Sequence, residues 1–292
     1  MILVSPQELP ARCDRPEAAE GLAVAILMCR PDHFGIEYEI NPWMHVAVSV
    51  DRSLAERQWN ALFSTYRELG APVDLVEPRP GLPDMVFTAN AAVVRNGAAV
   101  LSSFRHPERQ REEPVWRQEL ARRSLAAKTL RPGLAFEGAG DALFVGDTLF
   151  CGYGFRTDRA AHAEVGRLLG VDVVSLELVD PRFYHLDTCF CPLNERTVLF
   201  APDALSPASA RLVRRLVPHV IQVPLEVAAG FACNALPVAD VVVSSLAANR
   251  LERPLADAGF RTIELPMSEF MKSGGGVRCL SLPLDARHPE YT

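Results

Sequence analysis

The stretch "AAVVRNGAAVLSSF" at residues 91–104 decides how the rest of the chain is interpreted. Two apolar runs flank the pair Asn96-Gly97. An Asn-Gly pair between such runs is a strong hairpin signal, because both residues readily adopt the positive φ that a two-residue turn needs. The stretch therefore predicts an antiparallel hairpin that turns at residues 96–97.

The same pattern returns in "ALFVGDTLFCGYGF" (142–155), "CFCPLNERTVLFAP" (189–202) and "ALPVADVVVSSLAAN" (235–249). The turns are expected at Gly146-Asp147, Asn194-Glu195 and Ala239-Asp240. Hairpins that start at 91, 142, 189 and 235 are about 50 residues apart, a repeat length that is typical of propellers and solenoids.

A helical pattern and a further strand follow each hairpin, as in "ASARLVRRL" (208–216) before "HVIQVPL" (219–225). The start of the chain, from "LAVAILMCRP" (22–31), fits a first copy. We therefore predict an α/β fold, a five-bladed α/β propeller (pentein) of five strand-strand-helix-strand units around a pseudo-fivefold axis. The last apolar stretch, "CLSLPL" (279–284), is expected to form a strand that begins at the cysteine and pairs with the first unit. Ring closure of this kind removes exposed sheet edges.

The composition is ordinary for a globular protein that is able to bury a large core. The chain has 292 residues, of which 49% are hydrophobic and 23% charged. Residues 1–20 read as a loose extension without the features of a signal peptide, and residues 21–292 as a single domain. A net charge of −6 argues against nucleic acid as a partner, and no apolar run is long enough to span a membrane.

Seven cysteines without a CxxC pair indicate reduced thiols and a cytoplasmic location rather than a disulfide framework. Cys189 and Cys191 could suggest a metal pair, but the alternation around them favours a buried strand. We expect neither a metal nor a cofactor, and the sequence leaves homo-oligomerisation open.

Five polar loops join the third strand of one unit to the first strand of the next, and in a ring they would meet at one end. The loops are residues 81–90, 132–141, 180–188, 225–235 and 268–279. They would bring together Asp84, Asn90, Glu137, Asp141, His185, Asp187, Asn234 and Cys279. The last loop places three glycines before Cys279, which marks a tight turn or a close approach by another group. A helix stop before a buried structural cysteine is the alternative.

Four motifs carry a resemblance to a known family: "PDMVFTAN" (83–90), "FEGAGDALFVGD" (136–147), "RFYHLDTCF" (182–190) and "SGGGVRCLSL" (273–282). In this order they resemble the guanidine-modifying (amidinotransferase, or pentein) superfamily. "MCRPDHFGIEYEINPWM" (28–44) is similar to its branch of bacterial arginine dihydrolases and dimethylarginine dimethylaminohydrolase-like proteins. The fold of the family is the propeller that the repeats predict.

The resemblance implies a covalent mechanism. Cys279 would attack the guanidinium carbon and form a thiouronium-type intermediate, with His185 as general acid and base. Glu137, counted with the catalytic residues, and Asp141 flank a Gly-rich turn, and either carboxylate could hold a planar guanidinium by two hydrogen bonds. A capping role in the turn is the alternative for both. Asp187 could equally be a turn residue.

The remaining predicted substrate ligands are Asn90, Asp84, Asn41 and Arg109. Arginine deiminases and many dimethylarginine hydrolases carry an aspartate where Asn90 stands, and in the resemblance this asparagine marks the dihydrolase branch. Asn41 and Arg109 would hold the α-amino and α-carboxylate groups. A plain turn for Asp84 and a solvated charge cluster around Arg109 are the alternatives.

The resemblance thus implies a hydrolase that takes arginine to ornithine, CO₂ and ammonia. Its substrate would be a small molecule, arginine or a methylated arginine. A dimethylarginine dimethylaminohydrolase, which forms citrulline and dimethylamine, is the main alternative. An amidinotransferase and a non-catalytic pentein used as a binding module are the others.

Overall fold

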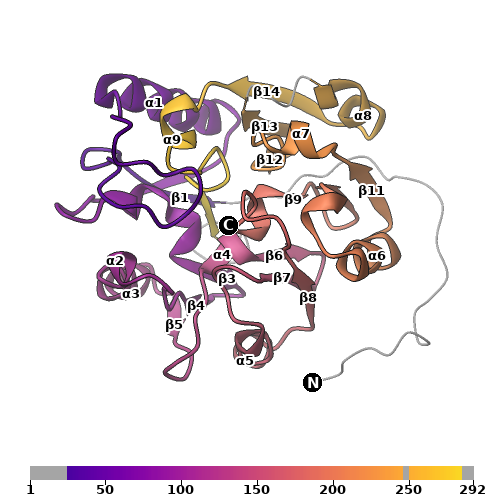
Figure 1. Ribbon diagram of the computed structural model, residues 1–292, viewed down its shortest axis with the longest axis horizontal. Coiled ribbons are helices and arrows are strands. Elements are labelled where there is room, and N and C mark those ends of the chain that lie inside the picture. Colours follow the sequence, from indigo (N-terminus) through magenta and orange to yellow (C-terminus); the bar gives the residue numbers. More distant parts are fainter. Residues whose placement is uncertain (1–24, 246–249, 285–292) are drawn as a thin grey trace.

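The computed structural model describes residues 25–245 and 250–284, and the predicted extension at 1–20 lies outside these ranges. The described chain is a mixed α/β fold with five three-stranded sheets (Figure 1). The sheets are β15(Leu282–Leu284)-β1(Ala25–Cys29)-β2(Val73–Val76), β3(Ala92–Arg95)-β4(Ala98–Leu101)-β5(Ala126–Lys128), β6(Ala142–Val145)-β7(Thr148–Tyr153)-β8(Val173–Glu177), β9(Phe190–Pro192)-β10(Thr197–Phe200)-β11(His219–Gln222) and β12(Leu236–Val238)-β13(Val241–Ser245)-β14(Arg261–Leu265).

All five sheets share one pairing pattern. The middle strand pairs antiparallel with one neighbour and parallel with the other. The four predicted hairpins are confirmed as the antiparallel pairs β3/β4, β6/β7, β9/β10 and β12/β13. At the first of them Asn96 and Gly97 have φ of 51° and 71°, which is why this dipeptide suits the turn.

A helix lies between the two parallel strands of each sheet, because parallel strands need a long crossover. These helices are α1(Arg52–Glu68), α2(Pro107–Gln110) with α3(Glu113–Arg122), α5(Arg159–Leu169), α6(Pro207–Leu216) and α8(Glu252–Asp257). In Figure 1 the longer helices lie at the periphery, and α4(Gly138–Asp141) lies near the middle.

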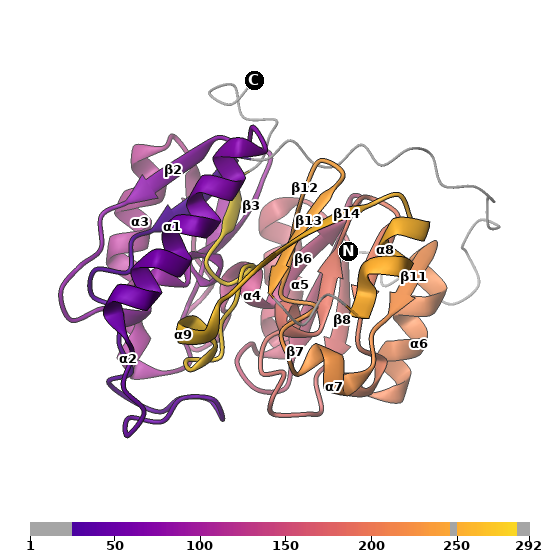
Figure 2. The same cartoon turned by 90° about the horizontal axis from the view of Figure 1, so that it is seen from above.

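Helix α1 shows how the sequence directs one face of a peripheral helix toward the core. Its buried residues Ala55, Trp59, Leu62 and Tyr66 recur at helical spacing, so one stripe of the helix faces the core. Asp51 caps its first turn by accepting from the backbone N–H of Leu54 at 2.9 Å. Figure 2 shows α1 beside β2, and α1 also contacts α9(Ser268–Met271), which lies next to it in Figure 1.

The first and last strands belong to one sheet, as predicted, with Ala25 opposite Leu284. The expectation that the last strand begins at Cys279 is wrong, because β15 covers Leu282–Leu284 alone. Turn hydrogen bonds, such as Leu280 N to Gly276 O at 3.3 Å, hold the preceding residues out of the ladder. Cys279 therefore sits on a turn just before the strand.

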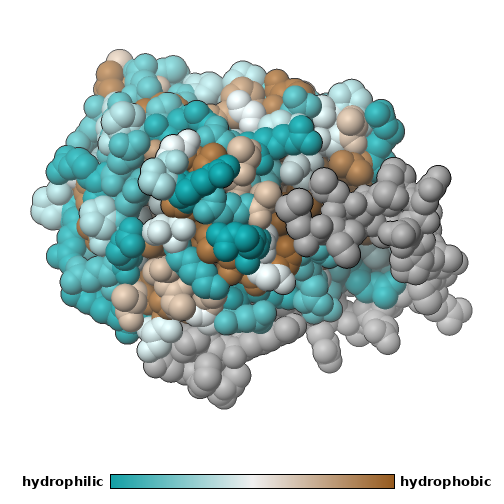
Figure 3. Space-filling view, turned by 90° about the horizontal axis from the view of Figure 1, so that it is seen from below, coloured by the Kyte–Doolittle hydropathy of each residue, from teal (hydrophilic) through white to brown (hydrophobic). Residues whose placement is uncertain are grey.

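The described surface has few large exposed hydrophobic side chains, namely Val46, Val48, Leu75, Val179 and Leu212. Hydrophilic residues predominate on the face in Figure 3, with hydrophobic residues in small groups. No helix within residues 25–245 and 250–284 has the length and apolar character needed to cross a membrane.

Candidate active site

Three of the five predicted polar loops, residues 81–90, 180–188 and 268–279, line one cavity of ≈ 270 Å³. The other two loops support it from behind, because Glu137 binds His185 and Asn234 binds Cys279. Short helical turns, η1(Pro83–Val86), η2(Thr88–Asn90), α4 and η3(Leu186–Thr188), stand just before the first strands of their sheets. The cavity is lined by Ile40, Asn41, Asp84, Phe87, Asn90, Arg109, Arg156, Tyr184, His185, Ser273 and Cys279. The structure thus brings together six of the eight predicted site residues at the cavity, all except Glu137 and Asp141.

Cys279 is held by two side chains from other loops. Its Sγ accepts a hydrogen bond from Asn234 Nδ2 at 3.1 Å, and its thiol donates to Asp187 Oδ2 at 3.3 Å. Asn234 Oδ1 in turn accepts from the backbone N–H groups of Arg278 and Cys279, at 3.1 and 3.3 Å. Burial, followed by the charge of Asp187, raises the pKa of the Cys279 thiol well above its ordinary value. In these surroundings the thiol is therefore neutral, and a cation beside it would favour the thiolate.

Asp187 stands where it can take the proton of that thiol. Burial raises the pKa of its carboxyl to about 7, and the charge of Arg278 partly offsets this rise. Its Oδ1 has no hydrogen-bond partner in the described part of the chain, whereas Oδ2 faces the Cys279 sulfur. A carboxyl that titrates near neutral pH can accept and return a proton at small cost.

The three glycines before Cys279 let neighbouring side chains pack directly against the backbone. Gly274 has φ +80°, and a Cβ atom there would lie 2.8 Å from the Tyr184 hydroxyl oxygen. A Cβ atom on Gly275 would lie 2.3 Å from Cε1 of Phe87. Two aromatic rings of the cavity region therefore pack directly on this backbone, which a larger residue would displace.

His185 receives its orientation from Glu137. Its Nε2 lies 2.8 Å from Glu137 Oε2, which also accepts from Arg156 Nη1 at 2.8 Å. Although burial acts to raise the pKa of Glu137, Arg156 and then His185 outweigh it and hold this pKa well below the usual range. Glu137 is thus a fixed carboxylate that lies behind His185 and outside the cavity lining.

Asp84 faces the cavity from η1 and is 3% exposed, unlike a plain surface turn residue. Its Oδ2 accepts from the Tyr38 hydroxyl at 2.9 Å, and its Oδ1 has no partner among the described residues. Burial raises the pKa of Asp84 to about 6, and Arg109 counteracts part of this rise. The free Oδ1 is a buried acceptor that a cationic substrate could satisfy.

Arg109 is buried, so the alternative of a solvated charge cluster does not describe it. Its Nε and Nη2 donate to Glu112 at 2.7 and 2.9 Å, and its Nη1 donates to Asn90 Oδ1 at 2.8 Å. Because the amide oxygen of Asn90 is taken, its Nδ2 is the free end, and it has no partner in the described ranges. A Cβ atom on Gly140 would lie 2.3 Å from this Nδ2, so only glycine leaves it room.

Asn41 and Asp141 bind neighbouring protein groups. Asn41 lines the cavity, but its Nδ2 donates to Ser273 O at 3.1 Å and its Oδ1 accepts from Trp43 N at 2.9 Å. Asp141 does not line the cavity, and its oxygens accept from Thr157 Oγ1 at 2.7 Å and Leu186 N at 3.0 Å. The structure places Asp141 as a support of the turn that follows His185.

Sequence reasoning missed three polar lining residues, Arg156, Tyr184 and Ser273, as well as the apolar Ile40. Arg156 lies after β7, outside the loops between units, and no motif or spacing marks it. Its Nη1 and Nη2 each donate one hydrogen bond, to Glu137 at 2.8 Å and to Ile40 O at 2.9 Å. Arg109 commits more of its donors to protein partners, so Arg156 has more N–H groups left for a ligand.

Within residues 25–245 and 250–284, no three His, Cys, Asp or Glu side chains are grouped so that they could hold a metal ion. The cysteines of these ranges, Cys29, Cys151, Cys189, Cys191, Cys233 and Cys279, are free and buried.

Known proteins resemble this chain over nearly its whole length. A family model described as N,N dimethylarginine dimethylhydrolase, eukaryotic, matches residues 30–285. The chain is 45% identical over 266 residues to the bifunctional arginine dihydrolase/ornithine cyclodeaminase ArgZ of Synechocystis sp., a match that covers 89% of this chain and 37% of ArgZ. It is 42% identical over 265 residues to the N(G),N(G)-dimethylarginine dimethylaminohydrolase of Mycobacterium tuberculosis, covering 90% and 85% of the two proteins.

The structural comparison agrees. The crystal structure of the N-terminal domain of an ArgZ variant, covalently bound to a reaction intermediate, matches with a TM-score of 0.86 at 43% identity, and the match covers 89% of this chain and 97% of that one. The chain therefore belongs to the N,N-dimethylarginine dimethylhydrolase family, within the branch of the guanidine-modifying superfamily that contains arginine dihydrolases and dimethylarginine dimethylaminohydrolases.

Proposed function

We propose that this protein is an arginine dihydrolase, which releases both terminal nitrogens of the guanidino group as ammonia in two hydrolyses, each through a covalent bond to Cys279. The observation that carries the proposal is the orientation of Asn90. Arg109 donates to its amide oxygen at 2.8 Å, so the neutral Nδ2 of this cavity-lining residue is the end without a partner among the described residues. The identity to ArgZ supports the same activity, although the chain spans 37% of the length of that relative.

The fold that we infer for this site is a five-bladed α/β propeller around a pseudo-fivefold axis, formed by a single domain of residues 21–292. Two observations support it. The five sheets share one strand order, and the first and last strands of the described chain pair in one of them. A second cavity is lined by residues of β3, β6, β9, β12 and β15, which is one edge strand from each sheet.

Arginine would bind through charges at both of its ends. The free Oδ1 of Asp84 would accept from the guanidinium, and the uncommitted N–H groups of Arg156 would hold the α-carboxylate. Arg109 and Asn41 would act mainly as supports, since their polar groups bind Glu112 and Ser273 O. Phe87 would form an apolar wall along the methylene chain.

The first hydrolysis would begin when the thiol proton passes to Asp187 and the Cys279 Sγ bonds to the guanidinium carbon. Protonated His185 would give its proton to the leaving nitrogen as the C–N bond breaks, which releases ammonia. A water molecule, deprotonated by His185, would then attack the carbon and break the C–S bond. The product of this half is citrulline.

The second hydrolysis would repeat these steps on the ureido group. Sulfur adds to the carbon, a second ammonia leaves, and water releases a carbamate that loses CO₂ to give ornithine. The ureido oxygen is an acceptor without positive charge, and Nδ2 of Asn90 would donate to it. A carboxylate at this position would place a negative oxygen against it in a buried site, which is unfavourable.

Dimethylarginine dimethylaminohydrolase activity is the second candidate, because the M. tuberculosis enzyme is covered over 85% of its length. Its chemistry would stop after one hydrolysis, with dimethylamine as leaving group. The two candidates differ in substrate and in whether citrulline persists.

A time course with arginine and with dimethylarginine tests the proposal. We expect two ammonia molecules per ornithine from arginine and little citrulline. Asn90→Asp should keep the first hydrolysis and accumulate citrulline, because it loses the neutral donor. Stoichiometric citrulline from the wild-type protein, or a strong preference for dimethylarginine, would refute the dihydrolase assignment and leave Cys279 as the nucleophile.

A further inference from the structure

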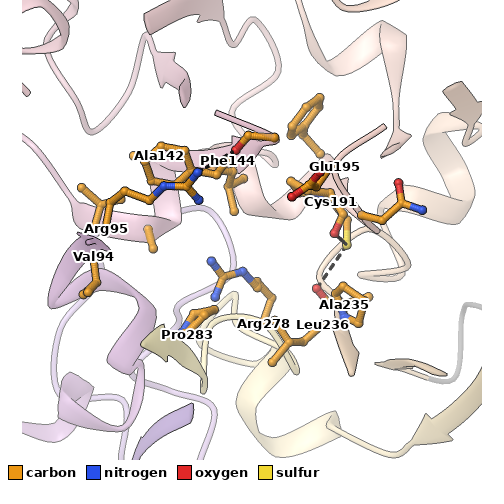
Figure 4. Close-up of a pocket in the computed structure, with 18 of the residues that line it drawn as sticks. Val94, Arg95, Ala142, Phe144, Cys191, Glu195, Ala235, Leu236, Arg278 and Pro283 are labelled. Atoms are coloured by element: carbon orange, nitrogen blue, oxygen red, sulfur yellow. Dashed lines mark hydrogen bonds between the residues drawn. The ribbon is translucent and has the colours of Figure 1, made fainter. Parts of the chain in front are cut away.

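A second cavity, larger than the substrate cavity, lies between one edge strand of each sheet, namely β3, β6, β9, β12 and β15 (Figure 4). The space within its walls, including the part open to solvent, is ≈ 1090 Å³. Gly146, Asn194 and Glu195 of the hairpin turns line it, whereas the substrate cavity is built from the residues that precede these hairpins. The two cavities therefore lie toward opposite ends of the same strands.

Arg278 distinguishes this cavity from an ordinary apolar void. It is 7% exposed, and Figure 4 shows its guanidinium pointing into the cavity. Within the described ranges this guanidinium makes one hydrogen bond, from Nη1 to Ser281 O at 2.6 Å, and no ion pair. Its charge interacts with Asp187 without a direct ion pair, so the cost of its burial is only partly offset, and its remaining N–H groups face the cavity.

The residues around Arg278 indicate which kind of ligand could bind its free N–H groups. The walls include Phe144, Phe190 and Leu236, which offer apolar contact. The other arginine of the lining, Arg95, is already paired with Asp147 at 2.6 Å and stacks on the Phe144 ring. Arg278 is thus the cation that retains free donors at this site.

We propose that this cavity binds a small carboxylate with an apolar body, whose carboxylate pairs with the guanidinium of Arg278 while its body lies against the aromatic and aliphatic walls. A guanidinium matches a carboxylate by two parallel hydrogen bonds, and the apolar walls favour an organic anion over a hydrated inorganic one.

An anion bound in this cavity would change the electrostatic environment of Cys279. Arg278 and Cys279 are adjacent, and Asn234 Oδ1 accepts from the backbone N–H of both. The charge of Arg278 also stabilises the ionised form of Asp187, the partner of the thiol. A bound anion would cancel this charge and leave Asp187 protonated to a higher pH, so turnover falls without a change in how arginine binds.

Benzoate is a suitable probe, with benzamide as its uncharged counterpart, and titration calorimetry measures both. We expect benzoate to bind and benzamide to bind at least about tenfold more weakly, because it lacks the charge-assisted pair. The variants Arg278→Gln and Arg156→Gln form a matched pair. Loss of binding in Arg278→Gln, with binding retained in Arg156→Gln, places the anion in the second cavity rather than in the substrate cavity.

A rim variant tests the same site if Arg278→Gln fails to fold. Glu195 is exposed at the mouth, and Glu195→Gln removes a charge that repels the anion, so benzoate should bind more tightly. The exposed residue Glu226 is absent from the lining, and Glu226→Gln should leave the affinity unchanged. Equal binding of benzoate and benzamide, loss in Arg156→Gln alone, or an unaltered affinity in Glu195→Gln would overturn the proposal. Each readout is independent of the substrate that the enzyme hydrolyses.

Discussion

The buried arginines of the two cavities differ in whether they form ion pairs. At the substrate cavity, Arg109 and Arg156 each form an ion pair with a buried glutamate behind the lining, Glu112 and Glu137. At the second cavity, Arg278 has no ion pair among the described residues. Paired charges hold side chains in fixed positions for chemistry, whereas an uncompensated charge favours an incoming counter-ion. The comparison teaches why we assign the proposed chemistry to the first cavity, where paired charges fix the side chains, and the proposed anion site to the second.

The largest expected effect separates the thiol at the substrate cavity from the other buried thiols. Cys279→Ser should reduce turnover to below about 1% of the wild-type rate, because a serine hydroxyl is far less acidic than a thiol and a carboxylate such as Asp187 is too weak a base to activate it. Cys151 is equally buried but lies in β7, and Cys151→Ser should retain activity. Initial rates with arginine and circular dichroism decide the matter. Turnover of more than a few per cent in Cys279→Ser would contradict its role.

A stability experiment tests whether the paired charges are as important as the comparison requires. Glu137→Gln leaves Arg156 buried without its carboxylate, and such a loss costs about 3–5 kcal/mol of unfolding free energy. As a control, Asp240→Asn breaks the exposed pair with Arg261 and should leave the unfolding midpoint within measurement error. Chemical denaturation of both variants is the measurement. Equal midpoints would show that burial of the Glu137–Arg156 pair is energetically unimportant.

The pH profile sharpens the role of the two acids near Cys279. The pKa values of Asp84 and Asp187 are raised to about 6 and about 7, so both are carboxylates above pH 7 and become protonated as the pH falls. Asp84 must be ionised to accept a cation, and Asp187 must be ionised to accept the thiol proton. Below pH 6, log kcat/KM should therefore fall with a slope of about two per pH unit.

The variant Asp84→Asn removes one of these ionisations. Its kcat/KM should be lower at every pH, and the slope of its acidic limb should be reduced to about one. Retention of the steeper slope in this variant would show that other groups control the profile.

The smallest expected effect is that of metal removal. Dialysis against a chelator should leave kcat and KM for arginine unchanged, since the thiol, imidazole and carboxylates of the proposed mechanism need no Lewis acid. A reconstitution series with zinc and manganese accompanies the experiment. Activity that is lost on dialysis and restored by either metal would contradict the mechanism.

Much of the architecture was accessible from local patterns. Dipeptides such as Asn96-Gly97 specify a turn by their own backbone preferences, and the repeated hairpins then predict which loops share one end. The loops that carry Asp84, His185 and Cys279 do meet as predicted. The family motifs implied the roles of these residues.

Other features could not be predicted, because they depend on partners from distant segments. Asp141 and Asp84 look alike in sequence, yet the oxygens of Asp141 are both bound by Thr157 and Leu186, while Asp84 keeps one free. Arg156 carries no motif at all.

The sequence by itself determined the hairpins, the alternation of strands and helices, and the loops in which reactive side chains occur, because these follow from backbone preferences and the periodicity of apolar residues. The tertiary structure alone decided which atom each side chain offers. Asn90 presents its N–H group only because Arg109 occupies its oxygen, and Asp187 meets Cys279 across 92 positions of the chain. Protonation and hydrogen-bond direction depend on what lies next to a group in space, and neighbours in space are set by packing rather than by position in the sequence.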